Sequence, residues 1–312
     1  MRAARCFKMM DSAKIKQLFE VFQKYGPVPR LLLRFLVPHT ELDFMSAYDV
    51  KLSGKVADRL AKRSSPASET HFREDDPHAI IMVNPAPDES MGFKHISTIY
   101  SQSIATPYIG GLIAAASNDE TKRGARLLYN WMFGQPQTRT SAGWVFEGRV
   151  HTILKAGGRF RLRRLSGHNN LARIDIKSGD TFTTLDNLAS HLRSAPGSPQ
   201  VSDAVVGVYQ HPARANLASI DSMVVVNIRN KGLQPILFQI TIAAQHPVKA
   251  SGLEQIVAAF PARLTVEPVL VFVVPASQSP YAAQEMDPKD HKYSKWSQYC
   301  MSIDDNRLWG RL

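Results

Sequence analysis

The chain has 312 residues, of which 44% are hydrophobic and 21% charged, the composition of a globular protein long enough for two domains. Its net charge of +11 favours a polyanionic partner, nucleic acid before an anionic membrane surface. The only cysteines, Cys6 and Cys300, are too far apart in sequence to frame a small disulfide-rich secreted fold. No run approaches the roughly 20 apolar residues of a membrane-spanning helix, and no signal peptide is recognisable. We expect an intracellular protein, with the nucleus as one candidate compartment.

The first part of the chain is predicted to be mainly helical. Over residues 11–36 the apolar side chains recur at three- and four-residue spacing, interrupted by KYGPVPR at 24–30. Helical patterning returns over 109–133, whereas the polar and proline-bearing stretches 64–70 and 84–90 predict loops. A change of character near 134–140 predicts a boundary there. We therefore expect a helical region over residues 1–135 and a second domain over 136–312.

The second part of the chain has the pattern of an α/β fold. A helix is predicted over 142–156, because its apolar residues follow helical spacing and two glycines end it. Five strand-like runs follow, and the last two are joined by RNKGLQ, which suits a hairpin loop. A second helix and a fully apolar strand come next. The strand-like runs are near 159–165, 181–185, 204–209, 220–228 and 235–242; the second helix is over 249–260 and the apolar strand starts at 269.

Four side chains in these elements are candidates for a catalytic site. Glu147 lies on the helix stripe predicted to face the sheet, where a carboxylate is costly unless a basic group or a metal ion pairs with it. Antiparallel pairing of the hairpin places Asp221 opposite Gln239 or Thr241. Lys249, in the first turn of the following helix, could point at the same end of the sheet.

These residue types suit metal-dependent hydrolysis of a phosphodiester. The oxygens of Glu147, Asp221 and Gln239 are ligands that Mg²⁺ accepts, or Mn²⁺ in its place, with water completing the octahedron. Lys249 would then orient the attacking water and stabilise charge developing on the phosphate. Each residue also has a commonplace alternative: Asp221 as a turn residue, Gln239 as a core amide and Lys249 as a solvated first-turn residue.

A basic strand is predicted next to these residues. In RFRLRRL the residues Arg159, Arg161 and Arg163 share one face, and Arg149 and Lys155 lie on the preceding helix. Such a surface could hold a phosphate backbone. The equally valid alternative is a charged edge strand that resists aggregation.

Several segments resemble a known family. YGPVPR, SAGWVFEGRVH, ASIDSMVV and LFQITIAAQHPVKASGLEQI are similar to the C-terminal part of Crinkler and retrotransposon-hot-spot proteins, weakly over 15–36 and more strongly over 125–276. Members of that family, many of them fungal, join a P-loop ATPase module to a nuclease-like domain of the restriction-endonuclease superfamily, the PD-(D/E)xK fold. The resemblance implies a restriction-endonuclease-like core, with a mixed central sheet flanked by helices. Residues 1–135 then resemble the helical tail of the ATPase module, and without a GxxxxGK[ST] motif we expect no ATP binding.

The resemblance also assigns roles to individual residues. It implies Glu147 as the helix glutamate, Asp221 as the strand aspartate and Gln239 at the first position of (D/E)xK. Thr241 stands where the superfamily often has lysine, so Lys249 looks like a migrated replacement. Gln in place of a carboxylate removes one negative charge from the ligand set and should weaken metal binding.

The expected function is hydrolysis of nucleic acid by an effector or mobile-element-associated protein, with DNA favoured over RNA as the substrate. His246, in the HPVK segment, either contacts a phosphate or ends the strand, and the second role is favoured. The main alternative is a catalytically degenerate module that keeps nucleic-acid binding or an effector role. A third is a truncated product whose helical region once docked on an ATPase.

Overall fold

The computed structural model describes residues 12–26, 42–63, 80–85, 100–167, 171–179, 181–182, 188, 190, 192–193, 201–212, 219–228, 232–261, 264, 266–289 and 291–310. The chain divides into two compact units, Met1–Gly148, with which Leu312 is grouped, and Arg149–Arg311. The division falls inside helix α7 (Arg139–Ala156), downstream of the boundary that the sequence predicts at 135/136.

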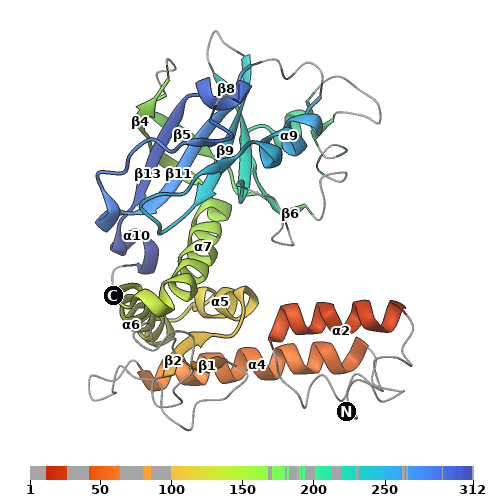
Figure 1. The fold of residues 1–312 in the computed structure, drawn as a ribbon, viewed down its shortest axis with the longest axis vertical. Helices are drawn as coiled ribbons and strands as arrows, with labels where there is room; N and C mark the ends of the chain where they lie inside the picture. Colours follow the sequence, from red (N-terminus) through yellow and green to blue (C-terminus); the bar gives the residue numbers. More distant parts are fainter. Residues whose placement is uncertain are drawn as a thin grey trace, which may run out of the picture. The chain divides into compact units, whose positions relative to one another are not determined.

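The first unit is built mainly from helices (Figure 1). They begin at side chains that satisfy the free amides of the first turn: Thr106 accepts from Ile109, and Asn118 accepts from Thr121 at 2.7 Å. The predicted helical segment 30–36 and loop 64–70 lie outside the described residues. The elements are α2 (Ser12–Tyr25), α4 (Leu42–Arg63), β1 (Ile81–Pro85) paired antiparallel with β2 (Tyr100–Ile104), α5 (Pro107–Ala114), α6 (Asp119–Gly134), and a 3-10 turn, η2 (Pro136–Thr138).

A polar network around Asp49 ties α2, α4 and α5 together. Tyr25, which is fully buried, donates its hydroxyl to Asp49 Oδ1 at 2.6 Å, and Tyr108 donates to the same oxygen at 2.7 Å. Lys24 Nζ donates to Asp49 Oδ2 at 2.8 Å. Burial raises the pKa of Asp49, but these hydrogen bonds outweigh it and hold the pKa below its usual value. The three donors therefore stabilise an ionised carboxylate between the helices.

Helices α4 and α6 approach closely enough to require a glycine. A Cβ atom placed on Gly124 would lie 1.9 Å from the carbonyl oxygen of Leu60 and 2.7 Å from its carbonyl carbon. The hydrogen of glycine is the only side chain that this separation admits. By contrast, a Cβ atom on Gly54, in α4, would meet no atom within 4 Å.

The second unit is organised around a mixed seven-stranded sheet with the strand order β4-β13-β11-β9-β8-β7-β6. Strands β8 and β9 form the predicted hairpin, and β11 and β13 continue the sheet parallel to β9. A separate two-stranded sheet pairs β3 with β5. The bounds are β3 (Gly158–Arg161), β4 (Arg163–Ser166), β5 (Arg173–Ile176), β6 (Thr181–Phe182), η3 (Asp203–Val205), β7 (Tyr209–Pro212), β8 (Ser222–Ile228), β9 (Gly232–Ile240), β10 (Val248–Lys249), α9 (Ala250–Ala258), β11 (Val269–Pro275), η4 (Ala276–Gln278), β12 (Met286–Asp287), η5 (Lys292–Lys295), β13 (Gln298–Ile303) and α10 (Asp305–Trp309).

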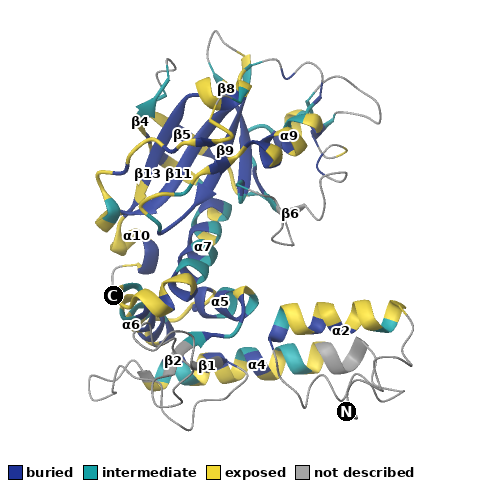
Figure 2. Ribbon diagram, in the orientation of Figure 1, coloured by how far each residue is buried: buried dark blue, intermediate teal, exposed yellow. Residues whose placement is uncertain are grey.

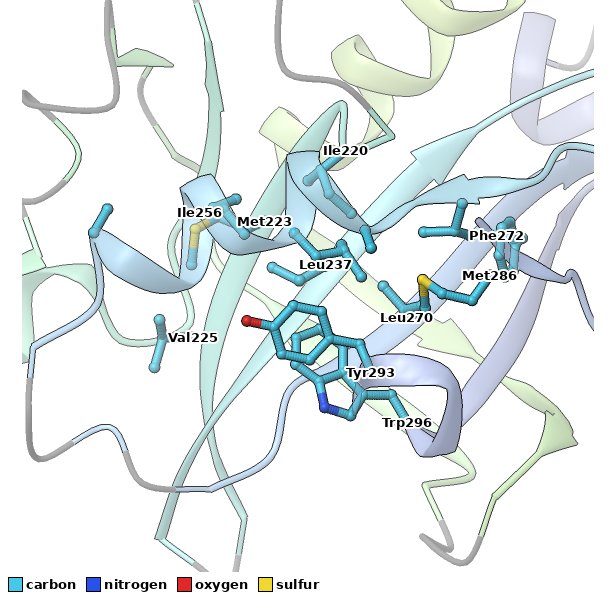
Figure 3. Packing of buried hydrophobic residues seen from close by; sticks show 14 of the residues in the cluster. Ile220, Met223, Val225, Leu237, Ile256, Leu270, Phe272, Met286, Tyr293 and Trp296 are labelled. Atoms are coloured by element: carbon cyan, nitrogen blue, oxygen red, sulfur yellow. The ribbon is translucent and has the colours of Figure 1, made fainter. Parts of the chain in front are cut away.

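One face of this sheet packs against α9. Met223, Leu237 and Leu270 are cross-strand partners on that face, and all three are buried with Ile256 of α9. Figure 3 shows Tyr293 and Trp296 packed beside Leu237 and Leu270 on the same cluster. Figure 2 shows β8, β9 and β11 buried along most of their length.

The opposite face of the sheet is covered by the second-unit part of α7. Tyr209 and Val224 are cross-strand partners whose side chains alternate with the α9-facing set, so they point to the other side. His151 of α7 hydrogen-bonds to the Tyr209 hydroxyl at 2.7 Å. The expected α/β fold class is thus confirmed, with helices on both faces of a mixed sheet.

Some elements differ from the sequence prediction. The run 159–165 forms two short strands instead of one, because β3 pairs with β5 whereas β4 pairs with β13. The run 204–209 begins in the 3-10 turn η3 and continues through isolated bridges at Val206 and Val208, and strand β7 starts at its last residue. Strands β5 and β13 were not predicted. Among the described residues, no helix combines the length and apolar character needed to cross a membrane.

Candidate functional site

The candidate site lies at the edge where β9 ends and β8 begins. Because β9, β11 and β13 are parallel, their carboxyl ends meet at this edge. In open α/β sheets ligands bind outside the carboxyl ends of the strands. Three of the predicted residues, Asp221, Gln239 and Lys249, come from chain segments at this edge.

Asp221 closes the mouth of the hairpin. Its backbone amide donates to the Phe238 carbonyl at 2.9 Å, and its Oδ2 accepts the Ile240 amide at 2.6 Å. The pairing of Ser222 with Phe238, continued by one residue, places Asp221 opposite Gln239. The Asp221 carboxylate therefore replaces the backbone partner that the β-ladder lacks at this point. A carboxylate has about four acceptor sites, so it can accept more than one hydrogen bond.

Gln239 brings a buried oxygen to the same edge. Its side chain is 4% exposed, and Oε1 has no hydrogen-bond partner among the described residues. Its cross-strand partner on β11 is Phe272, so Gln239 lies on the α9 face. A buried acceptor of this kind needs a donor or a cation to offset its loss of hydration. Thr241 is also buried, but its hydroxyl accepts the Ala243 amide at 3.0 Å and so serves the local turn.

Lys249 and His246 flank the start of α9. Lys249 is exposed, and its backbone amide donates to Ser219 Oγ at 2.7 Å, two residues before Asp221. This bond holds the start of α9 against the segment that leads into β8. The His246 amide donates to Gln284 Oε1 at 2.5 Å. Burial, assisted by the positive charge of Lys249, lowers the pKa of His246.

Glu147 belongs to the first unit. It is partly buried, and burial raises its pKa to about 7. His151 follows it by four residues on the same side of α7. The second-unit part of α7 covers the sheet face opposite to that of Gln239. The site at the hairpin mouth is therefore built from Asp221, Gln239 and Lys249.

Two histidines near this edge were not recognised in the sequence. The rings of His151 and His211 are 4.7 Å apart, edge to face, and the Tyr209 hydroxyl lies 2.7 Å from His151 Nδ1. Burial lowers the pKa of each histidine to about 4. The negative charge of Asp221 opposes this shift at His151, and the positive charge of Lys155 adds to it. Alternation in YQH, which puts Tyr209 and His211 on one face, was the available signal.

Buried polar groups without partners concentrate on three neighbouring strands. Among the described residues, both side-chain polar atoms of Gln210, Nδ1 of His211, Oγ of Ser222 and Oε1 of Gln239 are buried without a hydrogen bond. Gln210 is opposite Met223, so these side chains occupy adjacent positions of β7, β8 and β9. Gln210 and Gln239 lie on the α9 face, and Ser222 and His211 on the α7 face. This end of the sheet is thus unusually polar for a buried region.

The predicted phosphate-binding arginines are placed differently from one another. Arg149 is buried, and its Nε and Nη2 donate to the Leu308 carbonyl at 2.9 and 2.6 Å. Arg149 therefore holds α10 against α7, and its guanidinium is not available for the phosphate contact that the sequence predicted. Arg159, Arg161 and Arg163 are exposed. Arg163 donates to the Tyr281 carbonyl at 2.9 Å, and Arg159 pairs with Asp175 at 2.9 Å.

Comparisons with protein-family models, with curated proteins and with solved structures find no match to this chain. Within the described ranges, no group of three or more His, Cys, Asp or Glu side chains has the arrangement of a metal site.

The buried histidine pair predicts a loss of stability in mild acid. The pKa of His151 is about 4 in the folded chain and 6.5 when unfolded, so the unfolded chain binds more protons between these values. This contribution to stability is complete above pH 6.5 and falls as the pH drops towards 4. Between pH 7 and pH 5 the free energy of unfolding should fall in both proteins, and we expect the fall to be about 2 kcal/mol smaller in His151→Gln than in the unmodified protein. Urea unfolding at both pH values measures the difference; equal losses would contradict the assignment.

Proposed function

We propose that the second unit is a metal-dependent nuclease whose site lies at the mouth of the β8–β9 hairpin. The observation that carries the proposal is the convergence of Asp221, Gln239 and Lys249 at one sheet edge. Asp221 lies opposite Gln239 and bonds to the Ile240 amide, and the Lys249 amide bonds to Ser219. One carboxylate, one buried amide oxygen and one exposed ammonium thus come from three adjacent segments.

The residues at this edge suit a hard divalent cation. The Asp221 carboxylate and the Gln239 carbonyl are oxygen ligands for Mg²⁺ or Mn²⁺, and a ligand there would satisfy the unpartnered Gln239 Oε1. The ion would lower the pKa of a bound water and offset charge on the phosphate. Lys249, at the start of α9, would hold the phosphate and orient the attacking water. With a single carboxylate, we expect a weak site that needs a high concentration of the ion.

The fold supports the same proposal. The order α7, β8–β9 hairpin, α9, β11, with helices on both faces of a mixed sheet, is compatible with the restriction-endonuclease-like core of Crinkler and retrotransposon-hot-spot proteins. On this proposal the helices of the first unit correspond to the tail of an ATPase module. The net charge of +11 fits a nucleic-acid substrate, for which DNA is proposed.

A second candidate is a binding module that has lost turnover. Asp221 Oδ2 already holds the Ile240 amide at 2.6 Å, so the carboxylate has a structural role that would persist without catalysis. The amide of Gln239 and the hydroxyl of Thr241 stand where catalysis would use a carboxylate and an ammonium. Such a module would bind nucleic acid through its exposed arginines alone.

Cleavage assays separate these two functions. The full-length protein would be incubated with supercoiled plasmid, single-stranded DNA and RNA, each with Mg²⁺, with Mn²⁺ or with a chelator. The nuclease proposal expects nicking or linearisation of plasmid with either ion and no product with the chelator. Salt-sensitive binding without cleavage in any ion would contradict the nuclease and support the binding module. If the protein shows no binding and no cleavage, both proposed functions are contradicted.

A further inference from the structure

The two-stranded sheet of β3 and β5 exposes a face rich in arginine. Its other face is buried through Phe160, Ile174 and Ile176. The outward positions alternate with these residues and form two cross-strand pairs, Arg159 with Asp175 and Arg161 with Arg173. We refer to this two-stranded sheet as the basic ribbon.

The two outward pairs differ in charge. Arg159 Nε donates to Asp175 Oδ1 at 2.9 Å, so this pair is neutral. Arg161 and Arg173 stand directly opposite each other, both exposed, and neither has an ion pair among the described residues. Directly opposed side chains on one face have Cβ atoms about 5 Å apart, and like charges there repel. The pair is therefore unfavourable in the isolated ribbon and becomes favourable when an anion lies between the two guanidinium groups.

Another exposed cation lies at the opposite end of the ribbon from this pair. Lys177 follows Asp175 by two residues, just after β5 ends, so alternation puts it on the same face, and it is exposed. At the same end of the ribbon, Arg307 Nη2 donates to the Arg159 carbonyl at 3.3 Å, and its guanidinium lies 4.0 Å from the ring centre of Phe160, on the buried face. Asp175 is the one carboxylate on the outward face between residues 158 and 177 that the structure describes, and Arg159 neutralises it. The ribbon therefore presents a net positive face.

We propose that the basic ribbon binds the phosphate backbone of double-stranded DNA, with Arg161 and Arg173 bracketing one phosphate group. Single-stranded nucleic acid is usually held by aromatic side chains that stack on bases, and the outward positions of the ribbon carry none. The groove of a duplex also fits the element: a two-stranded ribbon enters the major groove of B-form DNA, about 12 Å wide, whereas that of A-form RNA is too narrow. The proposal rests on the nucleic-acid function proposed above but not on cleavage.

Binding measured with a chelator tests the ribbon independently of catalysis. The full-length protein would be titrated into a labelled DNA duplex at several salt concentrations, and compared with Arg161→Gln/Arg173→Gln. Because the contacts to one phosphate group are lost, the slope of log affinity against log salt should become shallower by about one. The affinity should fall at least about tenfold at low salt. The variant should unfold at an unchanged or higher temperature, since a repulsive pair has been removed.

A control variant tests whether the effect is specific to the ribbon or follows from any loss of positive charge. Lys289→Gln/Lys295→Gln removes two exposed positive charges from the same unit and should leave the salt slope unchanged. An unchanged slope in the ribbon variant, or an equal change in the lysine variant, would overturn the proposal. So would tighter binding to single-stranded DNA or duplex RNA. Binding that depends on the ribbon, without metal-dependent cleavage, would support the ribbon proposal and contradict the nuclease proposal. Metal-dependent cleavage together with an unchanged salt slope in the ribbon variant would support the nuclease proposal and contradict the ribbon proposal.

Discussion

Replacing Asp221 by asparagine is expected to lower metal-dependent cleavage by at least about a hundredfold, the usual loss when a group at the reacting centre is removed. Asparagine removes the negative charge that a divalent ion needs. Its side-chain oxygen can still accept the Ile240 amide, which lies 2.6 Å from Oδ2 in the unmodified protein. The hairpin mouth therefore stays closed in the variant. Rates of plasmid nicking with Mg²⁺ and Mn²⁺ measure the effect.

Asp203→Asn is the matched control. Asp203 is an exposed aspartate of the same unit in the turn η3, and its replacement changes the net charge equally. We expect cleavage and the unfolding temperature of this variant to match the unmodified protein. If Asp221→Asn cuts DNA as fast as Asp203→Asn, the ion is not held at the hairpin mouth. If Asp221→Asn unfolds early, its activity is compared at a temperature where both variants are folded.

The second large effect is expected for Gly124→Ala, which should destabilise the first unit by about 3 kcal/mol or more. The added methyl group would lie 1.9 Å from the Leu60 carbonyl oxygen, a backbone atom that no rotamer change can move aside. Helix α6 must then shift away from α4, and the buried side chains between them lose contact. Thermal and urea unfolding of the full-length protein, followed by circular dichroism, measure the loss.

Gly54→Ala separates this clash from the general effect of glycine in a helix. Gly54 lies within α4, and a Cβ atom there meets nothing within 4 Å. Alanine at such a position should stabilise the helix by roughly 0.5 to 1 kcal/mol. The two substitutions are chemically identical and lie on neighbouring helices, so opposite signs would confirm the close approach of α4 and α6. Equal signs would contradict it.

The sequence predicted the elements whose patterns are local. The helix over 142–156 and the strands on either side of RNKGLQ were found because apolar periodicity and turn chemistry are contained in short segments. The hairpin loop also fixed the pairing well enough to place Asp221 opposite Gln239 or Thr241, and the register of β8 with β9 selects Gln239. The position of Lys249 at the start of α9 followed in the same way.

The missed features depend on contacts between distant segments. Strand β13 has no strong alternation, and its place between β4 and β11 comes from pairing with strands far away in sequence. Arg149 was grouped with surface arginines because periodicity does not reveal that the Leu308 carbonyl, on α10, would receive its guanidinium. The contact of His151 with Tyr209 likewise joins a helix to a strand whose start was predicted too early.

The placement of β13 has a consequence for synthesis of the chain on the ribosome. Strand β4 is made early in the second unit, yet its neighbour in the sheet is residues 298–303, which emerge far later. Until then the free edge of β11 exposes unpaired backbone groups along a fully apolar strand, a template for pairing with other nascent chains. The sheet can therefore be completed only after β13 has been translated. Until then, a chaperone bound to β11 would protect the nascent chain from aggregation.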